Sequence, residues 1–237
     1  MIFFRDQDLS VEQHKAFGRH FGPLHRHPFV SPLAGEPDVL SVTKEAGERT
    51  NPGGQWHSDV SFAEEPPLGS ALYAVELPPF GDDTMWSNQY LAYETRSDGL
   101  KKTLECLRSV HGLGRYYDPK GGRYEEKRSI SLDRTKAESL PESVHPIVRV
   151  HPETGRKALY VNPAFTMRID GWTADESRPL LEFLYAHAMR PEFTCRLRWQ
   201  PHSLALWDNR CTMHHAINDD HGHRREMRRV TIAGSRP

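Results

Sequence analysis

Three candidate metal ligands, two of them close together in the sequence and one far away, constrain the fold of this chain more than any other feature. His57 and Asp59 lie two residues apart in the run QWHSDVSF. Residues two apart in an extended strand point to the same face, so their side chains can reach one ion together. His214, in WDNRCTMHHAIND, joins them only in a fold that returns the end of the chain to its middle.

Two histidines and one carboxylate on one face of an ion, with the opposite positions open, are typical of non-haem Fe(II) oxygenases. The His-Ser-Asp tripeptide alone is a weak signal, because single histidines are more often surface or hydrogen-bonded residues than ligands. The segment 206–231 strengthens the signal, because it reads as a strand, a turn, a histidine, a loop and a strand rich in arginine. That order is what closing a barrel around an ion requires, so the sequence predicts an iron site.

Composition excludes several other classes of protein. The 237 residues fit one β-rich domain, and 31 Lys and Arg against 32 Asp and Glu leave a formal charge of −1. No basic field favours a nucleic-acid partner, and no apolar run is long enough for a membrane. The three cysteines are scattered and the start of the chain lacks the features of a signal peptide, which predicts a cytoplasmic protein. Nothing in the sequence excludes a homo-oligomer.

Local patterns predict strands with helices packed outside them. Ser10 and Thr173 each start a capping-box pattern, so each predicts the beginning of a helix, the first ending near Gly22. Pro179 fits poorly inside the second helix, which leaves Ser177 as an alternative cap. A further helical pattern is broken near residues 97–99. The expected strands are 39–43, 70–76, 84–86 and the alternating run 193–199.

Seven segments in order resemble those of a known family. They are FFRDQDLSVEQHKAFGRHFGPLHRHP, WHSDVSF, ELPPFGDDTMWSN, HPIVRVHPETGRKALYVN, PEFTCRLRWQP, LALWDNRCTMHHA and RREMRRVTI. The chain resembles the taurine dioxygenase/TfdA family of Fe(II)- and 2-oxoglutarate-dependent dioxygenases. The resemblance implies a β-rich α+β fold, a double-stranded β-helix or jelly roll with flanking helices, as one domain over residues 1–237. Family members usually carry a further β-α segment before the FFRDQ-like run, and we expect this chain to lack it.

The resemblance also implies a set of site residues. His57, Asp59 and His214 match the Fe(II) ligands, with 2-oxoglutarate as cosubstrate and O2 as oxidant. Arg225 matches the arginine that binds the far carboxylate of 2-oxoglutarate, and Thr84 matches the threonine that shares this task. A planar guanidinium suits a carboxylate because it forms two parallel hydrogen bonds. The alternative is that Arg225 and its neighbouring arginines form a solvated basic edge.

Substrate residues follow from the same resemblance. His27 and Arg229 match residues that approach the sulfonate in the taurine enzyme, and Phe165 lies at a pocket position. Two contacts differ, because Gly53 and Val30 stand where that enzyme has asparagine and tyrosine. The loss of two polar groups favours an anion larger than taurine: a sulfonate, an alkyl sulfate, or an aryloxy or alkyl carboxylate. The predicted reaction hydroxylates this anion, with succinate and CO2 as co-products.

Other readings stay open at this point. The reaction could tailor a natural product or amino acid within the same family, or the chain could be a catalytically impaired metal- or anion-binding barrel. His215 is not expected to bind the metal, because adjacent strand residues face opposite sides. Asp208 and Asn209 are expected to set the turn and support the ligands. The polar stretch 112–143 reads either as a mobile lid or as a solvated linker.

Overall fold

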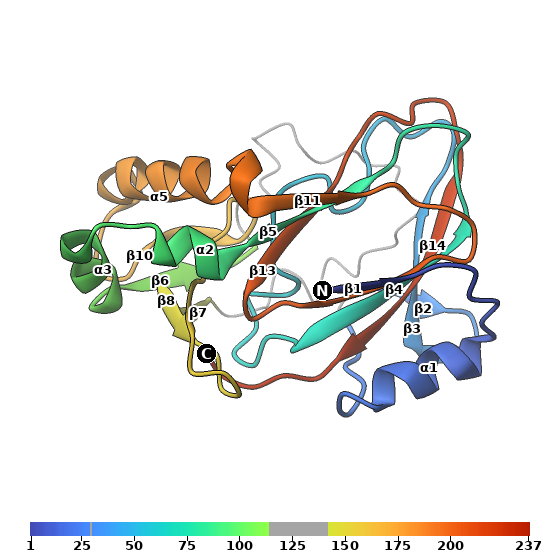
Figure 1. Cartoon of the computed structure of the whole chain (residues 1–237), viewed down its shortest axis with the longest axis horizontal. Coiled ribbons are helices and arrows are strands. Elements are labelled where there is room, and N and C mark those ends of the chain that lie inside the picture. The colour runs from blue at the N-terminus through green and yellow to red at the C-terminus, as the bar shows by residue number, and fades with distance from the viewer. Residues whose placement is uncertain (29, 114–141) are drawn as a thin grey trace.

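A computed structural model describes residues 1–28, 30–113 and 142–237, and in these ranges every strand pairs antiparallel (Figure 1). The strands are β1 Ile2–Phe4, β2 Pro32–Leu33, β3 Glu36–Lys44, β4 Gly69–Glu76, β5 Thr84–Asn88, β6 Arg108–His111, β7 Ser143–Pro146, β8 Val148–Val150, β9 Lys157–Leu159, β10 Thr166–Ile169, β11 Thr194–Leu197, β12 Leu204–Asp208, β13 Thr212–Ala216 and β14 Arg225–Ile232. The helices are α1 Val11–Arg19, α2 Gln89–Glu94, α3 Asp98–Glu105, α5 Ala174–Ala188 and the short 3-10 helix η1 Pro191–Phe193.

Two of the sheets share one buried core. The larger sheet has the strand order β1-β12-β4-β14-β3-β2, and a three-stranded sheet has the order β11-β5-β13. One apolar cluster contains side chains of both sheets: Leu72, Ala74, Ala205, Trp207 and Met227 from the first, and Trp86 and Leu197 from the second. The two sheets therefore pack against each other, as expected for strands that bury one face.

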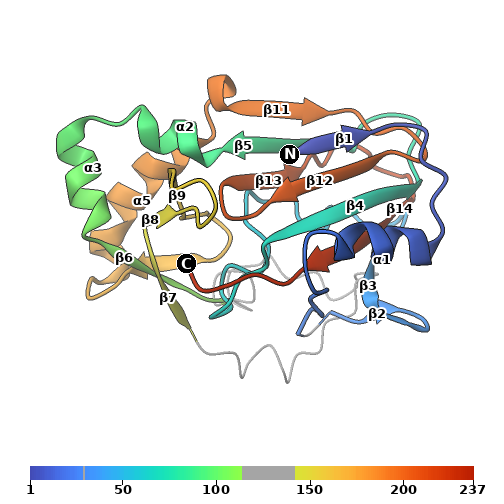
Figure 2. The same cartoon turned by 60° about the horizontal axis from the view of Figure 1, so that its bottom comes forward.

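The outer face of the large sheet is covered as well. Side chains alternate along β4, so that Leu72 belongs to the shared core while Ala71 and Tyr73 lie in a different cluster. Phe17 of α1 packs against that second cluster, and α1 contacts β3, β4 and β14. Figure 2 shows α1 against this sheet and α2, α3 and α5 at the other end of the molecule. Both faces of β4 are buried, which holds the strands around the site rigidly.

The remaining helices build a second core with the smaller sheets. Leu181 and Leu184 of α5 are buried beside Ala92 of α2, Leu104 of α3 and Ile169 of β10. The sheets here are β10-β6-β7 and the pair β8-β9. This helical end lies away from α1 and supports the side of the site formed by β13 (Figure 1).

The local sequence predictions are largely confirmed. Ser10 and Thr173 both form capping boxes, and Pro179 lies inside α5 after all, so Ser177 is not the cap. The first helix ends earlier than predicted, at Arg19. Strands 39–43, 70–76 and 84–86 lie within β3, β4 and β5, and the helical pattern breaks between α2 and α3 as expected. The alternating run 193–199 is only partly a strand, because β11 ends at residue 197 and Cys195 is exposed.

Two further observations concern the described residues. Within the described ranges, no helix is both long and apolar enough to cross a bilayer. The cysteines are all free, as expected. The prediction of a lid or linker at 112–143 falls mainly on residues 114–141, which lie outside the described residues.

Candidate metal centre and active site

Backbone pairing brings the two candidate histidine ligands together. His57 forms an isolated antiparallel bridge with His214 of β13, in which each amide N–H donates to the other residue's carbonyl oxygen at 3.0 and 2.8 Å. The prediction of an extended strand through Asp59 is wrong, because residues 59–62 form turns and Val60 has a φ of +50°. A turn, and not strand alternation, therefore directs the Asp59 carboxylate to the histidines.

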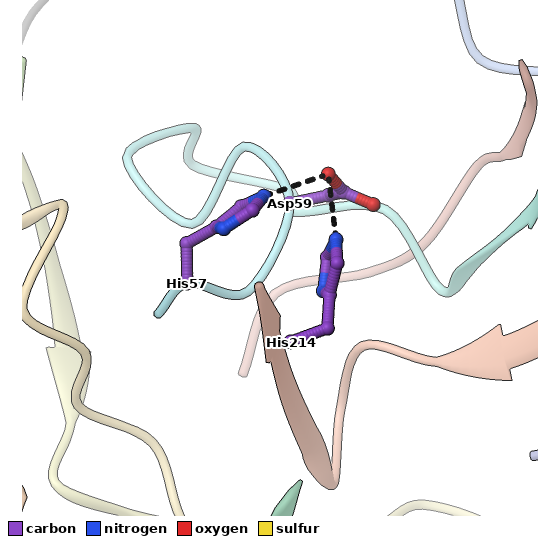
Figure 3. Close-up of side chains that lie close together, drawn as sticks. All are labelled: His57, Asp59 and His214. Atoms are coloured by element: carbon purple, nitrogen blue, oxygen red, sulfur yellow. Dashed lines mark ion pairs between the residues drawn. The ribbon is translucent and has the colours of Figure 1, made fainter. Parts of the chain in front are cut away.

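The three side chains point to one place (Figure 3). Asp59 Oδ1 lies 3.6 Å from His57 Nε2 and 3.8 Å from His214 Nε2, and the three ligand atoms all lie within 4.8 Å of one another. His57 Nδ1 donates to the Gln55 carbonyl oxygen at 2.6 Å, which leaves Nε2 as the unprotonated nitrogen of the neutral ring. Two ligands about 2.1 Å from one ion lie at most about 4.2 Å apart. The distances from Asp59 Oδ1 to the two histidine nitrogens are within this limit, so the three side chains could hold a divalent metal.

The other oxygen of Asp59 is held by neighbours. Asp59 Oδ2 accepts hydrogen bonds from Ser70 Oγ at 2.8 Å and from Asn209 Nδ2 at 3.4 Å. Asn209 Oδ1 in turn accepts from the Asp59 amide and from Trp207 Nε1. The expected supporting role of Asn209 is therefore consistent with its contacts. Ser70 was missed, because a serine in a buried strand carries no sequence signal for this contact.

Arg229 lies against the metal ligands and not only against the substrate space. Its Nη1 donates to Asp59 Oδ1 at 2.7 Å, the same oxygen that faces both histidines. Burial alone would raise the pKa of Asp59, but Arg229, followed by His214 and His57, holds this pKa well below its usual value. Asp59 is therefore a carboxylate at any physiological pH, which is the form that binds metal.

Two neighbouring groups are set apart from this centre. The His215 ring packs on Trp56, with 4.6 Å between centroids, and does not join the three ligands. His151, Asp208 and Cys211 form a second compact group. There, Arg210 donates to both carboxylate oxygens of Asp208, at 2.9 and 2.6 Å, and His151 is 3.0 Å from Oδ2. The ion pair saturates this carboxylate, so we regard the second group as structural.

Arg225 and Thr84 line the same cavity as the three ligands. Arg225 is 1% exposed, and its Nη2 has no hydrogen-bond partner among the described residues. A buried guanidinium nitrogen without a partner is costly unless an acceptor is supplied, and a bound carboxylate supplies one. Thr84 Oγ1 accepts from Trp199 Nε1 at 2.9 Å, which leaves its own proton available for a ligand. The two residues fit the far carboxylate of 2-oxoglutarate.

Three further charged residues surround Arg225 and were not predicted. Asp82 pairs with Arg225 Nε, and Lys44 Nζ donates to Asp220 Oδ1 at 2.8 Å. Asp82, Lys44 and Asp220 are each 0% exposed. Local sequence gives no signal for this cluster, because its members come from β3, β14 and the segments before β5 and β14.

The other end of the cavity is mostly apolar. His27 and Phe165 line it together with Arg229, and the apolar lining includes Val30, Leu40, Val42, Val60, Phe62, Leu72 and Leu113. The His27 Nδ1 atom accepts from the Val30 amide at 3.1 Å, so Nε2 carries the proton. Burial, followed by the charge of Arg229, lowers the pKa of His27 to about 3. His27 is therefore a neutral hydrogen-bond donor, and Arg229 supplies the positive charge.

Gly53 is also part of this lining. Its φ of +76° favours glycine, and a Cβ built on it would lie 3.1 Å from His57 Cε1. The glycine therefore leaves room beside the ligand and adds no polar group to the cavity.

Comparison with known proteins agrees with this geometry. The family model of the taurine catabolism dioxygenase TauD, TfdA family matches residues 1–231. An α-ketoglutarate-dependent sulfate ester dioxygenase of Pseudomonas putida is 35% identical, over 100% of this chain and 78% of the relative. The structure of a taurine dioxygenase from Burkholderia xenovorans is 41% identical, with a TM-score of 0.79 over 98% of this chain and 75% of the other. The structure of AAD-2 with Mn(II) and N-oxalylglycine is 31% identical, with a TM-score of 0.79 over 99% and 82%.

Proposed function

This chain belongs to the taurine catabolism dioxygenase TauD, TfdA family, and from that premise we propose that it is an Fe(II)- and 2-oxoglutarate-dependent dioxygenase that hydroxylates a small organic anion bearing an apolar group. The observation that carries the proposal is one cavity lined by the three metal ligands, by the buried Arg225 and by an apolar wall beside Arg229. Sulfate esters and sulfonates are the favoured substrates, because the Pseudomonas putida relative is a sulfate ester dioxygenase and the Burkholderia xenovorans structure is a taurine dioxygenase.

Different residues are proposed to bind the metal and the cosubstrate. His57, Asp59 and His214 hold the metal, and Arg225 with Thr84 holds the far carboxylate of 2-oxoglutarate. The bound iron supplies the oxidising chemistry, with O2 as oxidant and with 2-oxoglutarate decarboxylated to succinate and CO2. The use of a 2-oxoglutarate-like ligand is supported by the related structure that contains Mn(II) and N-oxalylglycine.

The protein positions the substrate by charge and by packing. Arg229 attracts the anionic head, and the neutral His27 donates one hydrogen bond to it. Phe165 packs edge-on against the His57 ring, with 6.1 Å between centroids, and against Phe62 at 5.0 Å. These rings exclude water from the space next to the metal, and each buried CH2 of a substrate tail stabilises the complex by roughly 0.8 kcal/mol.

We further assign the fold as a double-stranded β-helix that forms a single domain over residues 1–237. The support is that two antiparallel sheets pack over one apolar core. The site lies between β4 and β14 of one sheet and β5 and β13 of the other. Location in the cytoplasm stays a prediction that is compatible with three free cysteines.

A substrate series tests the proposal. The enzyme is loaded with Fe(II), and succinate formation is measured with 2-oxoglutarate and with taurine, butyl sulfate, hexyl sulfate or octyl sulfate. We expect kcat/KM to rise with tail length and to exceed the value for taurine by at least about tenfold, the equivalent of about two buried CH2 groups. Succinate that forms equally without any added anion would contradict the substrate proposal, and no Fe(II)-dependent succinate would contradict the reaction.

A further inference from the structure

The carboxylate of Asp82 lies against Arg225, the residue proposed to bind the far carboxylate of 2-oxoglutarate. We propose that Asp82 is a positioning residue that pairs with Arg225 in the free enzyme and takes up one proton when the carboxylate of 2-oxoglutarate binds there. The inference rests on the proposed function, because it assumes that Arg225 is the cosubstrate anchor. Asp82 and its buried neighbours Lys44 and Asp220 were not predicted from the sequence to belong to the site.

The geometry fixes Asp82 tightly beside Arg225. Asp82 Oδ1 accepts from Asn51 Nδ2 at 3.0 Å, and the Asp82 amide donates to Asp219 Oδ1 at 2.7 Å. Its φ of +60° is a left-handed conformation that few residues other than glycine, asparagine and aspartate adopt. The two hydrogen bonds thus hold Asp82 in a left-handed backbone conformation, from which its Oδ2 pairs with Arg225 Nε.

The charge count of the buried cluster supports proton uptake. The cluster contains two cationic side chains, Lys44 and Arg225, and two acidic ones, Asp82 and Asp220. The cosubstrate carboxylate adds a third negative charge to a space in which these four residues are at most 1% exposed. An unbalanced charge is expensive in such a space, and a proton on Asp82 restores the balance. The bound cosubstrate and Asp82 then share Arg225, with Asp82 as a neutral acid.

Several charged groups on other elements face Asp82. Arg225 faces it from β14, Lys44 from β3, and Asp219 and Asp220 from the segment before β14. The neighbouring Asp83 is paired with Arg196 of β11 at 2.5 Å, and Arg196 also lies 3.9 Å from Asp219. Arg196 is shared by Asp83 and Asp219, and because Arg196 and Asp219 are partly exposed, solvent screens the remaining negative charge of this group.

The protonation behaviour of Asp82 agrees with the geometry. Burial raises the pKa of Asp82 to about 7, against the opposing charge of Arg225 and with help from Asp220. Both protonation states are therefore accessible near neutral pH, and ligand binding selects the protonated one. Because binding consumes a proton only where Asp82 starts ionised, the dissociation constant of 2-oxoglutarate should rise about tenfold per pH unit above about pH 7.5.

Titration calorimetry with the Mn(II)-loaded enzyme tests this without turnover. 2-Oxoglutarate is titrated at pH 8 in HEPES and in Tris, whose different ionisation enthalpies report the number of protons taken up. We expect about one proton per 2-oxoglutarate for the wild type and close to none for Asp82→Asn, whose affinity should be nearly independent of pH from 7 to 8.5. Asp83→Asn is the matched control at the adjacent position, and it should keep the wild-type proton count and pH dependence.

The outcomes separate this inference from the proposed function. Wild-type binding without proton uptake, or an Asp82→Asn variant that keeps the uptake, overturns the role of Asp82 and leaves the cosubstrate site intact. Failure of the wild type to bind 2-oxoglutarate, or unchanged binding in Arg225→Gln, overturns the proposed cosubstrate site itself. Asp82→Gly, which relieves the positive φ, replaces Asp82→Asn if the latter does not fold, and it is expected to lose the uptake as well.

Discussion

The two oxygens of Asp59 have different surroundings, and this difference shapes the site. Oδ2 is held by Ser70 and Asn209, while Oδ1 faces His57, His214 and the guanidinium of Arg229. One oxygen is thus fixed by hydrogen bonds and the other is presented to cations. A metal held by His57, Asp59 and His214 would share Oδ1 with Arg229, which places the positive charge of Arg229 directly beside the proposed metal position.

Loss of this carboxylate should remove the metal. For Asp59→Ala we expect Fe(II) binding and turnover to fall below detection, because two neutral imidazoles alone hold a divalent ion weakly and the half-buried Arg229, left without its carboxylate partner, repels it. Equilibrium dialysis with Fe(II) under anaerobic conditions measures the retention. His215→Ala is the control, since this ring lies outside the ligand group, and it should bind Fe(II) normally. Undiminished Fe(II) binding by Asp59→Ala would exclude Asp59 from the site.

A change at Arg225 that keeps its charge tests whether the planar shape of the guanidinium is needed to bind 2-oxoglutarate. Arg225→Lys keeps the positive charge but loses the planar fork, so the buried carboxylate of 2-oxoglutarate keeps an unsatisfied oxygen. We expect the KM for 2-oxoglutarate to rise roughly tenfold or more, the equivalent of about 1.4 kcal/mol. Steady-state kinetics at saturating substrate measure this, and an unchanged KM would show that another cation does the anchoring.

Among the elements, β13 and the turns around it decide where the ligands meet. The bridge between His57 and His214 ties a loop to the middle of β13, and β13 in turn pairs with β5, which carries Thr84. The two candidate histidine ligands and the proposed cosubstrate residue Thr84 are therefore linked by one set of backbone hydrogen bonds. The helices act only indirectly, because α5 packs with Met213 of β13 in the same core cluster.

The start of α5 offers a test of how much this support contributes to stability. Thr173 Oγ1 accepts from the Glu176 amide, and the Glu176 side chain accepts from the Thr173 amide. For Thr173→Ala we expect the free energy of unfolding to fall by about 1 kcal/mol, because one helix amide loses its acceptor. Urea denaturation measures this. Thr173→Ser keeps the cap and should stay within about 0.5 kcal/mol of the wild type; an equal loss in both variants would contradict the capping explanation.

At the scale of the whole molecule, the protein buries many ionisable groups, both in its cavity and elsewhere. His14 and His111 are 1% and 0% exposed, and their pKa values are lowered to about 4 and about 3, in both cases mainly by burial. The pKa of His27 is lowered to about 3 in the same way. Asp82 is shifted in the opposite direction, since burial raises its pKa to about 7.

These shifts predict the pH dependence of stability. Below pH 6.5 the unfolded chain protonates the three histidines and the folded chain does not, so the unfolded state gains protons and stability falls with falling pH. Asp82 opposes this trend, because between about pH 4 and 7 the folded state binds its proton more tightly. The effect of the three histidines exceeds that of the single Asp82. We therefore expect the free energy of unfolding of the metal-free protein to fall by at least about 2 kcal/mol from pH 6.5 to pH 5.

Urea denaturation at several pH values in the presence of a chelator measures this fall. Asp82→Asn removes the opposing group, so its loss of stability over the same range should be larger than that of the wild type. A stability that is constant or rises between pH 6.5 and pH 5 would show that the buried histidines are protonated in the folded protein.

The sequence by itself determined the local elements and the chemistry of the residues. Ser10 and Thr173 begin helices because capping depends on residues only three positions apart. The strands predicted at 39–43, 70–76 and 84–86 lie where expected, whereas the run 193–199 is a strand only over β11. The matched segments were enough to identify the family and to name His57, Asp59 and His214 together. Each of these signals is local, or is carried by a motif that relatives share.

Only the tertiary structure decided how the charged groups are paired. The chain places Arg229 on Asp59 and Asp82 on Arg225, and it buries Lys44 with Asp220, residues that lie 176 positions apart in the sequence. Pairings of this kind depend on which strands become neighbours and on which groups lose their water, and no local pattern records either. Asp59 itself reaches the histidines through a turn, so the predicted ligand set came together by a backbone path that strand alternation does not describe.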